Sequence, residues 1–251
     1  MTAYSALTAA NYRAYVRDRT TLFFTFAFPL FFLGIFGLIF RGETVEPDNL
    51  PYINYIAPGV LSWGVGNAAV FAVAFTLVTW RRDDLLRLIW RTPTRTRTVI
   101  GARCSVALGV GLVQAVLFAA VALLPVFGLR ITSTWPLALP VLVAGIAAFL
   151  ALGVVVGTVC DTPEAVGAVG NFVMVPMAFL SGAFYPMSMM PGWLQTVSWA
   201  LPLRYFNDGI ADALSGRATW GQTGLDCLAL VGFTVLFGLV GLRAFRWSDR
   251  R

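Results

Sequence analysis

The 251-residue sequence contains neither Lys nor His, and only 12% of its residues are charged. Without Lys the chain cannot contain a Walker A motif, because the Lys of that motif binds the nucleotide phosphates. Without His it has no imidazole for acid–base catalysis or metal binding. The acidic residues are scattered, and no HExxH or GxSxG motif occurs. The sequence therefore predicts that this chain has no catalytic residues, no bound cofactor and no metal site of its own.

Cysteine is also scarce, and its spacing gives no sign of a functional role. The three Cys residues, Cys104, Cys160 and Cys227, lie far apart and form no CxxC pair. Metal sites and redox motifs place cysteines two to four residues apart. We therefore interpret all three as small apolar residues.

The low content of charged residues is accompanied by a hydrophobic content of 58%. Soluble domains carry roughly 25% charged residues. In water, a fold of the present composition would expose apolar surface that it could not cover. In a bilayer, the same surface is solvated by lipid tails. The composition thus predicts an integral membrane protein.

Six long stretches with no charged residues, or with charges only near their ends, are long enough, or nearly so, to cross a bilayer, which takes about 20 apolar residues in a helix. Their expected ranges are about 20–40, 55–80, 105–128, 137–159, 165–183 and 225–244. A polar loop follows the first stretch, with no small-residue cleavage site, so we predict a span there instead of a signal peptide. The fold class is therefore all-α integral membrane, with residues 1–251 forming a single transmembrane domain.

The distribution of Arg predicts the orientation of these spans. Fourteen of the eighteen Arg residues lie before the first span, between the second and third, or at and after the end of the sixth. Because cytoplasmic segments carry an excess of basic residues, both termini are predicted to be cytoplasmic. The tryptophans Trp135, Trp193, Trp199 and Trp220 fall at the expected outer boundaries, as in an aromatic belt. The net charge of +6 is explained by loops held at the anionic inner leaflet, and we exclude nucleic acid as a partner.

Residues 1–19 are predicted to form an interfacial helix at the inner membrane surface. Tyr4, Leu7, Tyr12 and Tyr15 would share a broad arc of this helix, with Arg13 and Arg17 opposite. Such a helix lies with its apolar face in the headgroup region. A loosely ordered basic tail is the alternative interpretation.

The longest inner segment, residues 81–103, is a candidate docking element. Asp83 and Asp84 suit a helix N-terminus, where carboxylates offset exposed N–H groups. A short apolar face and a Pro stop follow. An amphipathic helix at this place would dock a soluble partner. Alternatively, it would lie on lipid with its Arg residues as anchors, and the composition favours neither interpretation. The candidate coupling residues are Asp83, Asp84, Leu85, Leu86, Arg87, Leu88, Arg91 and Pro93.

The outer stretch 179–206 is apolar but repeatedly interrupted by Pro and Gly. Proline removes a backbone donor, and unpaired backbone groups cannot face lipid. We therefore expect short helices packed against the spans, forming an outer-leaflet re-entrant hairpin over about 184–210 between the fifth and sixth spans. A long, partly ordered outer loop is the alternative. The residues that mark this hairpin are Gly182, Tyr185, Pro186, Pro191, Trp193 and Pro202.

Polar residues within the spans are few, and Asn67, Gln114 and Asn171 are the candidates for a substrate path. Interhelical hydrogen bonding is the competing interpretation for each of them. Gly153 and Gly157 form a GxxxG pair, which permits close helix approach but also occurs by chance. Asp226 lies at the outer mouth of the last span and is not expected to be buried.

The sequence fits a secondary transporter, a channel or an intramembrane enzyme less well. Ion-coupled transporters usually need an ionised residue within the membrane and often show interrupted helices in matching halves. Neither pattern is evident here, which counts against a secondary transporter or channel. An intramembrane enzyme would need clustered acid, base or nucleophile residues, and none is seen.

Three segments resemble one family, the ABC-2 type permeases of exporters related to daunorubicin-resistance and nodulation transport proteins. They are YINYIAPGVLSWGV at 52–65, LLRLIWRTPTRTRTVIGAR at 85–103, and FLSGAFYPMSMMPGWLQTVSWALPLRYFNDGI at 179–210, which is the most specific. Many members carry Glu-x-Gly before the Leu-Arg run. Here Arg82, Asp83 and Asp84 stand there instead.

The resemblance implies a division of labour. A separate ATP-binding subunit would bind ATP and magnesium, and two permease subunits, identical or paralogous, would form the pathway in the lipid bilayer. The 81–103 loop and the N-terminal helix would contact the ATPase, and the outer hairpin would act as a lid. The implied function is ATP-driven export from the cell, with drug or antibiotic efflux as the first substrate class and lipid or glycoconjugate export as the alternative.

Overall fold

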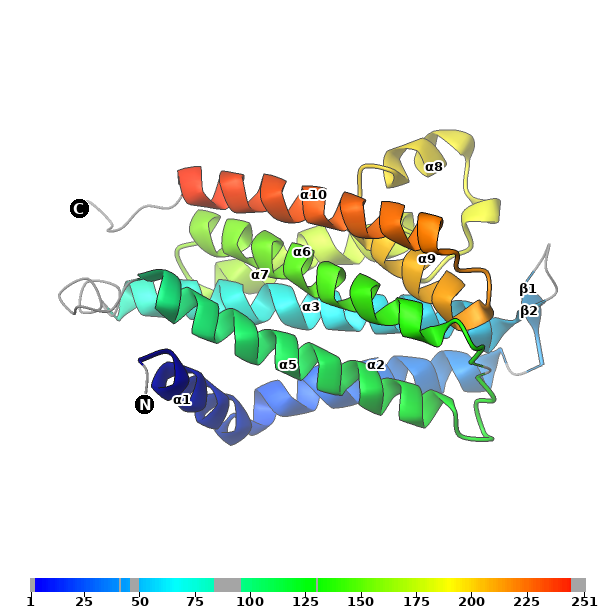
Figure 1. The fold of residues 1–251 in the computed structure, drawn as a ribbon, viewed down its shortest axis with the longest axis horizontal. Helices are drawn as coiled ribbons and strands as arrows, with labels where there is room; N and C mark the ends of the chain where they lie inside the picture. Colours follow the sequence, from blue (N-terminus) through cyan, green and yellow to red (C-terminus); the bar gives the residue numbers. More distant parts are fainter. Residues whose placement is uncertain (1–2, 41, 46–49, 84–95, 130, 245–251) are drawn as a thin grey trace.

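The computed structural model describes residues 3–40, 42–45, 50–83, 96–129 and 131–244, which fold into a helical bundle (Figure 1). The long helices are α2 (Arg19–Ile39), α3 (Tyr52–Arg82), α5 (Thr96–Ala122), α6 (Ala138–Val159), α7 (Pro163–Leu180) and α10 (Trp220–Ala244). The shorter helices are α1 (Ala3–Arg17), α8 (Gly192–Ser198) and α9 (Pro202–Ser215), with 3-10 turns η1 (Trp135–Leu137) and η2 (Met187–Met189). Strands β1 (Thr44–Val45) and β2 (Leu50–Pro51) pair antiparallel between α2 and α3.

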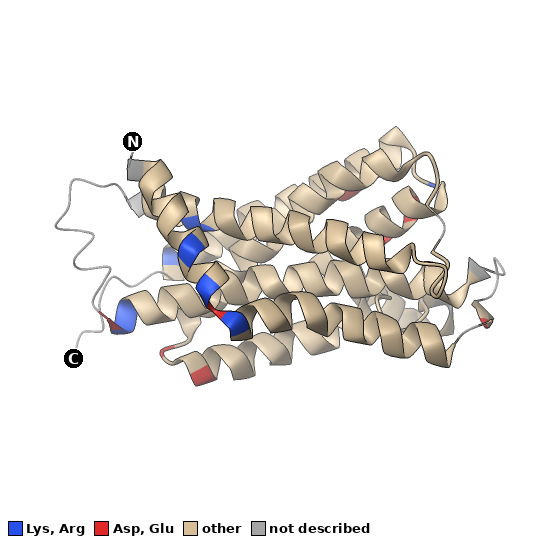
Figure 2. Cartoon of the chain, turned by 90° about the horizontal axis from the view of Figure 1, so that it is seen from below, with Lys and Arg blue, Asp and Glu red and all other residues tan. Residues whose placement is uncertain are grey.

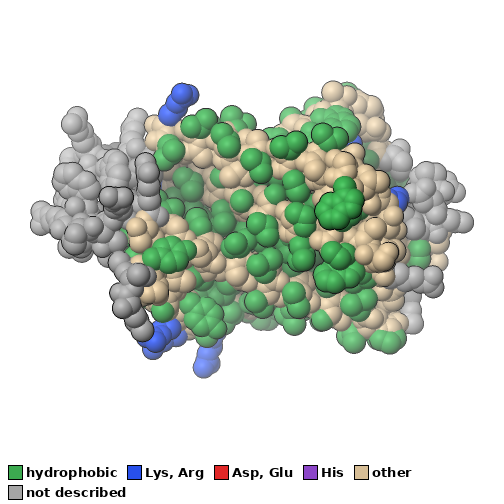
Figure 3. Space-filling view, in the orientation of Figure 1, with side chains coloured by type: hydrophobic (Ala, Val, Ile, Leu, Met, Phe, Trp, Pro, Cys, Tyr) green, Lys and Arg blue, Asp and Glu red, His purple; other side chains and the backbone are tan. Residues whose placement is uncertain are grey.

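Six helices in the described part of the chain are long and apolar enough to cross a membrane, in agreement with the six predicted spans. A helix satisfies its backbone donors and acceptors within the segment, which a bilayer core requires. The face shown in Figure 3 carries hydrophobic side chains across its middle, and the basic side chains visible there lie toward its ends. This face is therefore suited to solvation by lipid tails.

The third helix differs from its predicted range of 105–128. Helix α5 begins at Thr96 and ends at Ala122. It ends there because Pro125, which lacks an N–H donor, follows closely, and the chain then turns with Gly128 at a φ of +70°. The early start places Arg103 inside the helix, whereas the sequence interpretation counted it with the loop.

The start of α1 and the end of α10 lie at the same end of the bundle, and most of the described basic residues gather there (Figure 2). Helix α2 begins with Arg19, and α3 ends with Arg81 and Arg82. Arg243 lies in the last turn of α10. The side chains of Trp135, Trp193, Trp199 and Trp220 are all more than half exposed. They belong to elements at the opposite end. This is the arrangement that the Arg and Trp distributions predict, and the cytoplasmic assignment of the termini stays a prediction.

Helices α3 and α6 form the centre of the bundle, and the GxxxG pair lies in their contact. A Cβ on Gly153 would lie 2.5 Å from the carbonyl oxygen of Val70, and one on Gly157 would lie 3.0 Å from Cα of Ala74. The lack of side chains at these two positions permits the close approach of the two helix backbones. At the end of this contact, Arg81 donates to the carbonyl of Gly157 and lies 3.7 Å from Asp161.

Helix α1 packs against α5, and the hydroxyls of Tyr4 and Ser105 are hydrogen bonded. The chain then turns at Asp18, whose carboxylate accepts the backbone N–H of Thr21 at 3.0 Å and caps α2. The predicted helix at 1–19 is thus present as a helix over Ala3–Arg17. Its position at the membrane surface stays a prediction.

Candidate functional site: a cavity between α1, α2, α3 and α5

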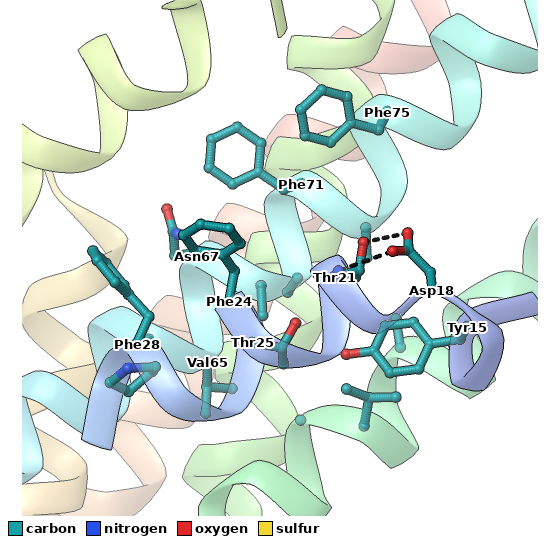
Figure 4. A pocket seen from close by; sticks show the side chains of 18 of the residues that line it. Tyr15, Asp18, Thr21, Phe24, Thr25, Phe28, Val65, Asn67, Phe71 and Phe75 are labelled. Atoms are coloured by element: carbon teal, nitrogen blue, oxygen red, sulfur yellow. Dashed lines mark hydrogen bonds between the residues drawn. The ribbon is translucent and has the colours of Figure 1, made fainter. Parts of the chain in front are cut away.

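A cavity of about 450 Å³ lies between the α1–α2 turn and helices α2, α3 and α5 (Figure 4). Its lining runs along α2 from Asp18 to Pro29 and along α3 from Phe75 to Trp63. These stretches correspond to a length of about 16–18 Å at 1.5 Å per helical residue. The volume falls within the range of about 300–1,000 Å³ that is typical of small-molecule sites.

The end of the cavity near the termini is polar. Tyr15, Asp18, Thr25 and Arg103 line it. Burial raises the pKa of Tyr15, so its hydroxyl remains a proton donor at neutral pH. The hydrogen bonds from Thr21 lower the pKa of the Asp18 carboxyl, which therefore remains ionised. Figure 4 shows Asp18 and Thr21 joined by hydrogen bonds, with the Tyr15 hydroxyl directed toward Thr25 instead of toward this pair.

Arg103 enters this end from α5. Its guanidinium donates to the carbonyl of Ala72 on α3, with Nη2 at 3.1 Å and Nε at 3.4 Å. The hydroxyl of Thr76 bonds to the same carbonyl at 2.7 Å. Among the described residues, no carboxylate lies within ion-pair distance of Arg103. The cavity therefore contains a positive charge held by a neutral oxygen.

The rest of the lining is apolar and rich in aromatic rings. The ring of Phe28 lies 5.9 Å from that of Trp63, and Phe71 stacks on Phe75 at 5.5 Å. Phe24 projects from α2 toward the same space (Figure 4). Aromatic side chains offer large apolar contact area at a modest cost in conformational entropy. A polar end joined to an aromatic wall suits an amphipathic ligand.

Of the three residues predicted for a substrate path, the structure places one in the lining of the cavity and one next to its wall. Asn67 lines the cavity from α3. Gln114 on α5 is adjacent to its wall, because a Cβ on Gly64 would lie 3.3 Å from Gln114 Nε2. Oδ1 of Asn67 and both amide atoms of Gln114 are buried without a hydrogen-bond partner among the described residues. Asn171 is exposed on α7 and is not part of this site.

The candidate coupling residues fall mostly outside the described residues. Asp84, Leu85, Leu86, Arg87, Leu88, Arg91 and Pro93 belong to the undescribed range 84–95. Asp83 is described and exposed, and it caps the C-terminal end of α3, where its N–H bonds to the carbonyl of Thr79. The ATPase-docking role of this segment stays a prediction.

The outer stretch forms the short helices η2, α8 and α9 after a turn at Gly182, whose φ is +75°. Tyr55 on α3 donates to the carbonyl of Gly182. Pro186, Pro191 and Pro202 each stand at the start of one of these helices, where the missing N–H costs nothing. Tyr185 and Trp193 are exposed. Whether this region enters the outer leaflet stays a prediction.

Helix α9 is the best enclosed part of this outer region, since it packs against α3, α6 and α10 (Figure 1). On α10, Asp226 faces it, and a Cβ on Gly209 would lie 3.4 Å from Asp226 Oδ2. Only 4% of Asp226 is exposed. The expectation that Asp226 would not be buried is therefore wrong. The reason is that α9 packs over the outer end of α10. The apolar pattern of one span does not show which other helices pack against it.

Arg204 holds the outer helices together. Its guanidinium lies 3.7 Å from the ring centre of Trp199, donates to the carbonyl of Gln195 at 3.2 Å, and forms an ion pair with Asp208 at 3.4 Å. It also bonds to the hydroxyl of Ser198. One largely buried side chain thus joins α8 to α9.

We expect Arg204→Ala to lower the unfolding free energy by about 2 kcal/mol, because it removes a stacked cation and leaves Asp208 without its partner. Arg204→Lys should be intermediate, since an ammonium keeps the charge but loses the planar stacking. Thermal unfolding of the purified proteins in uncharged detergent gives their midpoint temperatures, which should fall from wild type to Arg204→Lys to Arg204→Ala. Arg217→Ala is the matched control, because half-exposed Arg217 forms an ion pair with Asp212 that should contribute at most about 1 kcal/mol. Equal midpoint temperatures for Arg204→Ala and Arg217→Ala would contradict the conclusion that Arg204 joins α8 to α9.

Sequence reasoning missed Arg103 and Tyr15 as residues of the cavity. Arg103 was counted among the positive-inside residues, and Tyr15 was placed on the membrane face of the N-terminal helix. A signal was nevertheless present, because Arg103 directly precedes a long uncharged stretch. A cation at that position must lie either in the headgroup region or in an internal cavity.

Helix number, length and hydropathy define the molecule as a polytopic α-helical membrane protein. Comparison with known proteins narrows this class to one family. The family model described as ABC-2 type transporter matches residues 2–214, and the chain belongs to this family. Members are permease subunits of transporters, and the family generally works with an ATP-binding subunit.

Three relatives illustrate the range of the family. Nodulation protein J of Sinorhizobium fredii is 30% identical over 220 residues, covering 83% of this chain and 80% of the relative. Daunorubicin resistance ABC transporter permease protein DrrB1 of Streptomyces coeruleorubidus is 25% identical over 240 residues, covering 87% and 77%. Inner membrane transport permease YadH of Escherichia coli K12 is 24% identical over 222 residues, covering 87% and 82%.

Proposed function

We propose that this chain is the permease subunit of an ATP-driven exporter that moves amphipathic small molecules out of the cell. The observation that carries the proposal is the ABC-2 family match over residues 2–214 in a chain without Lys, which cannot form a Walker A motif. A separate subunit would then bind ATP and magnesium. The name of the relative DrrB1, a daunorubicin resistance permease, makes drug or antibiotic efflux the first candidate, with lipid or glycoconjugate export next.

The proposed assembly contains two permeases and their ATP-binding subunits in the cell membrane, with the termini of this chain in the cytoplasm. The second permease is a copy of this chain or a paralogue. The exposed Asn171 and Phe172 on α7 are available to such a partner. The segment 81–103, with Asp83 at the end of α3, would receive the movement of the ATPase. Because α3 also lines the cavity, this movement would reach the bound substrate through one continuous helix.

Transport in inside-out vesicles tests the proposal. Vesicles that contain both this chain and the ATP-binding subunit that co-purifies with it should accumulate a fluorescent amphipathic compound only when ATP and magnesium are added. Positively charged, neutral and negatively charged compounds are to be compared. Vesicles without the ATP-binding subunit, and vesicles whose ATPase lacks its Walker A Lys, are the controls. Equal accumulation without the ATPase would instead support a self-sufficient transporter, and failure of the solubilised chain to retain any ATPase would also refute the proposal.

A further inference from the structure

The charge of the cavity singles out one kind of ligand. Arg103 is the eighth residue of α5, so its Cα lies about 10 Å along the helix from its start. Enclosing a cation among packed helices is costly, and Arg residues in such places usually face partners or aqueous cavities on a substrate path. The carbonyl of Ala72, which holds Arg103, already accepts the Thr76 hydroxyl. The guanidinium thus has donors to spare and, among the described residues, no carboxylate within ion-pair distance.

Tyr15 adds a second donor beside it. Only 8% of Tyr15 is exposed, and its hydroxyl lies next to Thr25, whose polar side chain partly offsets the rise in the Tyr15 pKa that burial causes, but the hydroxyl does not reach hydrogen-bond distance of any described residue. Leaving a buried hydroxyl unbonded costs about 1–3 kcal/mol. In Figure 4 the hydroxyl points to the part of the cavity beside Thr25. A ligand oxygen at this position would accept from both Tyr15 and Arg103.

The Asp18 carboxylate lines the same end but does not cancel this charge. It is exposed, and both of its oxygens accept hydrogen bonds from Thr21, at the N-terminus of α2. A carboxylate at this position is already offset by the positive end of the helix. The interior of the polar end is therefore governed by Arg103, while the remainder of the cavity is aromatic.

We propose that this cavity binds an amphipathic anion, whose phosphate or carboxylate group is held by Arg103 and Tyr15 and whose apolar part lies against Phe28 and Trp63. The inference deepens the proposed function by assigning a substrate class to the site, and in that respect it rests on the proposed function. Guanidinium groups bind phosphate and carboxylate through paired hydrogen bonds. The anion would also supply the partner that Tyr15 lacks.

Binding to the purified wild-type protein in an uncharged detergent is the direct test, with native mass spectrometry to count bound molecules. Dodecyl phosphate should give a saturable single adduct per chain. Dodecyltrimethylammonium, with the same tail and the opposite charge, should bind at least tenfold more weakly, and inorganic phosphate alone should not bind. Phosphatidic acid is titrated in parallel, and its rank against dodecyl phosphate distinguishes a two-chain lipid from a single-chain amphiphile as the preferred anion. Equal binding of the cationic and anionic probes would overturn the proposal.

Variants then assign the site. Arg103→Gln should weaken dodecyl phosphate binding at least tenfold while an amide still reaches the Ala72 carbonyl, and Arg103→Lys should restore part of it. Tyr15→Phe should weaken binding about threefold. Arg243→Gln, which removes the same charge from the exposed end of α10, is the matched control and should not change binding. If Arg103→Gln does not yield monodisperse protein, the binding of dodecyl phosphate to Arg103→Lys and Tyr15→Phe decides whether these two residues hold the anion.

Asp18→Asn separates this proposal from its opposite. Asn still caps a helix, so the variant removes a charge without removing the cap. Affinity for the anionic probe should rise or stay unchanged. A cation site centred on Asp18 would instead show strong dodecyltrimethylammonium binding that this variant abolishes. Binding without ATP-dependent transport would refute the proposed function alone, whereas ATP-dependent transport that ignores ligand charge and Arg103 would refute this inference alone.

Discussion

A Gly153→Leu variant should lose most of its monodisperse protein, because the substitution forces apart the two central helices. Even the first added carbon would lie 2.5 Å from the carbonyl oxygen of Val70 on α3, which is backbone and cannot rotate away. Inserting bulk into a packed core costs about 1–3 kcal/mol, and here a whole side chain must enter a backbone contact. We expect a cost at or above the top of that range. Size-exclusion chromatography after detergent extraction measures the monodisperse fraction.

Gly238→Leu on α10 is the matched control for this variant. No atom lies within 4 Å of a Cβ added at Gly238, so the same side chain would be placed on an open surface. We expect its yield and unfolding midpoint to remain close to those of the wild type. Comparable losses in both variants would mean that Leu is harmful for reasons other than the α3–α6 contact.

The sequence predicted the features that depend on one segment at a time. Six apolar stretches became six helices, because a bilayer leaves the backbone almost no other choice. The prolines after Gly182 predicted short helices, and η2, α8 and α9 each begin beside one. The GxxxG pair pointed to close helix packing, although its partner on α3 could not be named. In each case the cause is local geometry, which residue type and spacing determine.

The features that depend on neighbouring helices could not be predicted. All faces of a membrane helix are apolar, so the pattern along α3, α5 or α7 does not reveal which polar residue points inward. Asn67 lines the cavity and Gln114 is buried next to its wall because α3 packs on α5, whereas Asn171 is exposed on α7. Arg103 was assigned to a loop because a charge normally ends a predicted span. A cavity allows the helix to continue past it. Asp226 was misjudged for a similar reason, since α9 covers it.

The position of the cavity gives α3 a central part in the proposed mechanism. Asn67 and Phe71 of this helix line the cavity, and the carbonyl of Ala72 accepts a hydrogen bond from Arg103. The hydroxyl of Tyr55 donates to the carbonyl of Gly182 in the outer turn. Its last residues join the segment proposed to meet the ATPase. A movement of α3 would therefore change the cavity and the outer helices together. The contact between α3 and the outer turn is accordingly the place where a small change should have a large effect.

Gly59→Ala should detach the outer turn from α3. The added methyl carbon would lie 1.9 Å from the carbonyl oxygen of Ala183, whereas Cβ atoms essentially never approach such an atom within 3.0 Å. The backbone must therefore move by about 1 Å or more, and the bond from Tyr55 to the Gly182 carbonyl should break. With the three native cysteines replaced by Ala, a Ser181→Cys probe reports this movement. Ser181 is fully buried, so maleimide labelling should be slow in the parent and at least tenfold faster with Gly59→Ala.

Gly192→Ala provides the control for the same outer region, because a Cβ there meets no atom within 4 Å. Labelling of the Ser181→Cys probe should stay slow in that background. In the proposed exporter, a detached outer turn would leave the outer end of the pathway open. ATP-dependent accumulation in vesicles should therefore fall at least tenfold with Gly59→Ala and remain near the parent level with Gly192→Ala. Slow labelling and normal transport in Gly59→Ala would show that α3 and the outer turn do not need this contact, and the coupling assigned to α3 would have to be abandoned.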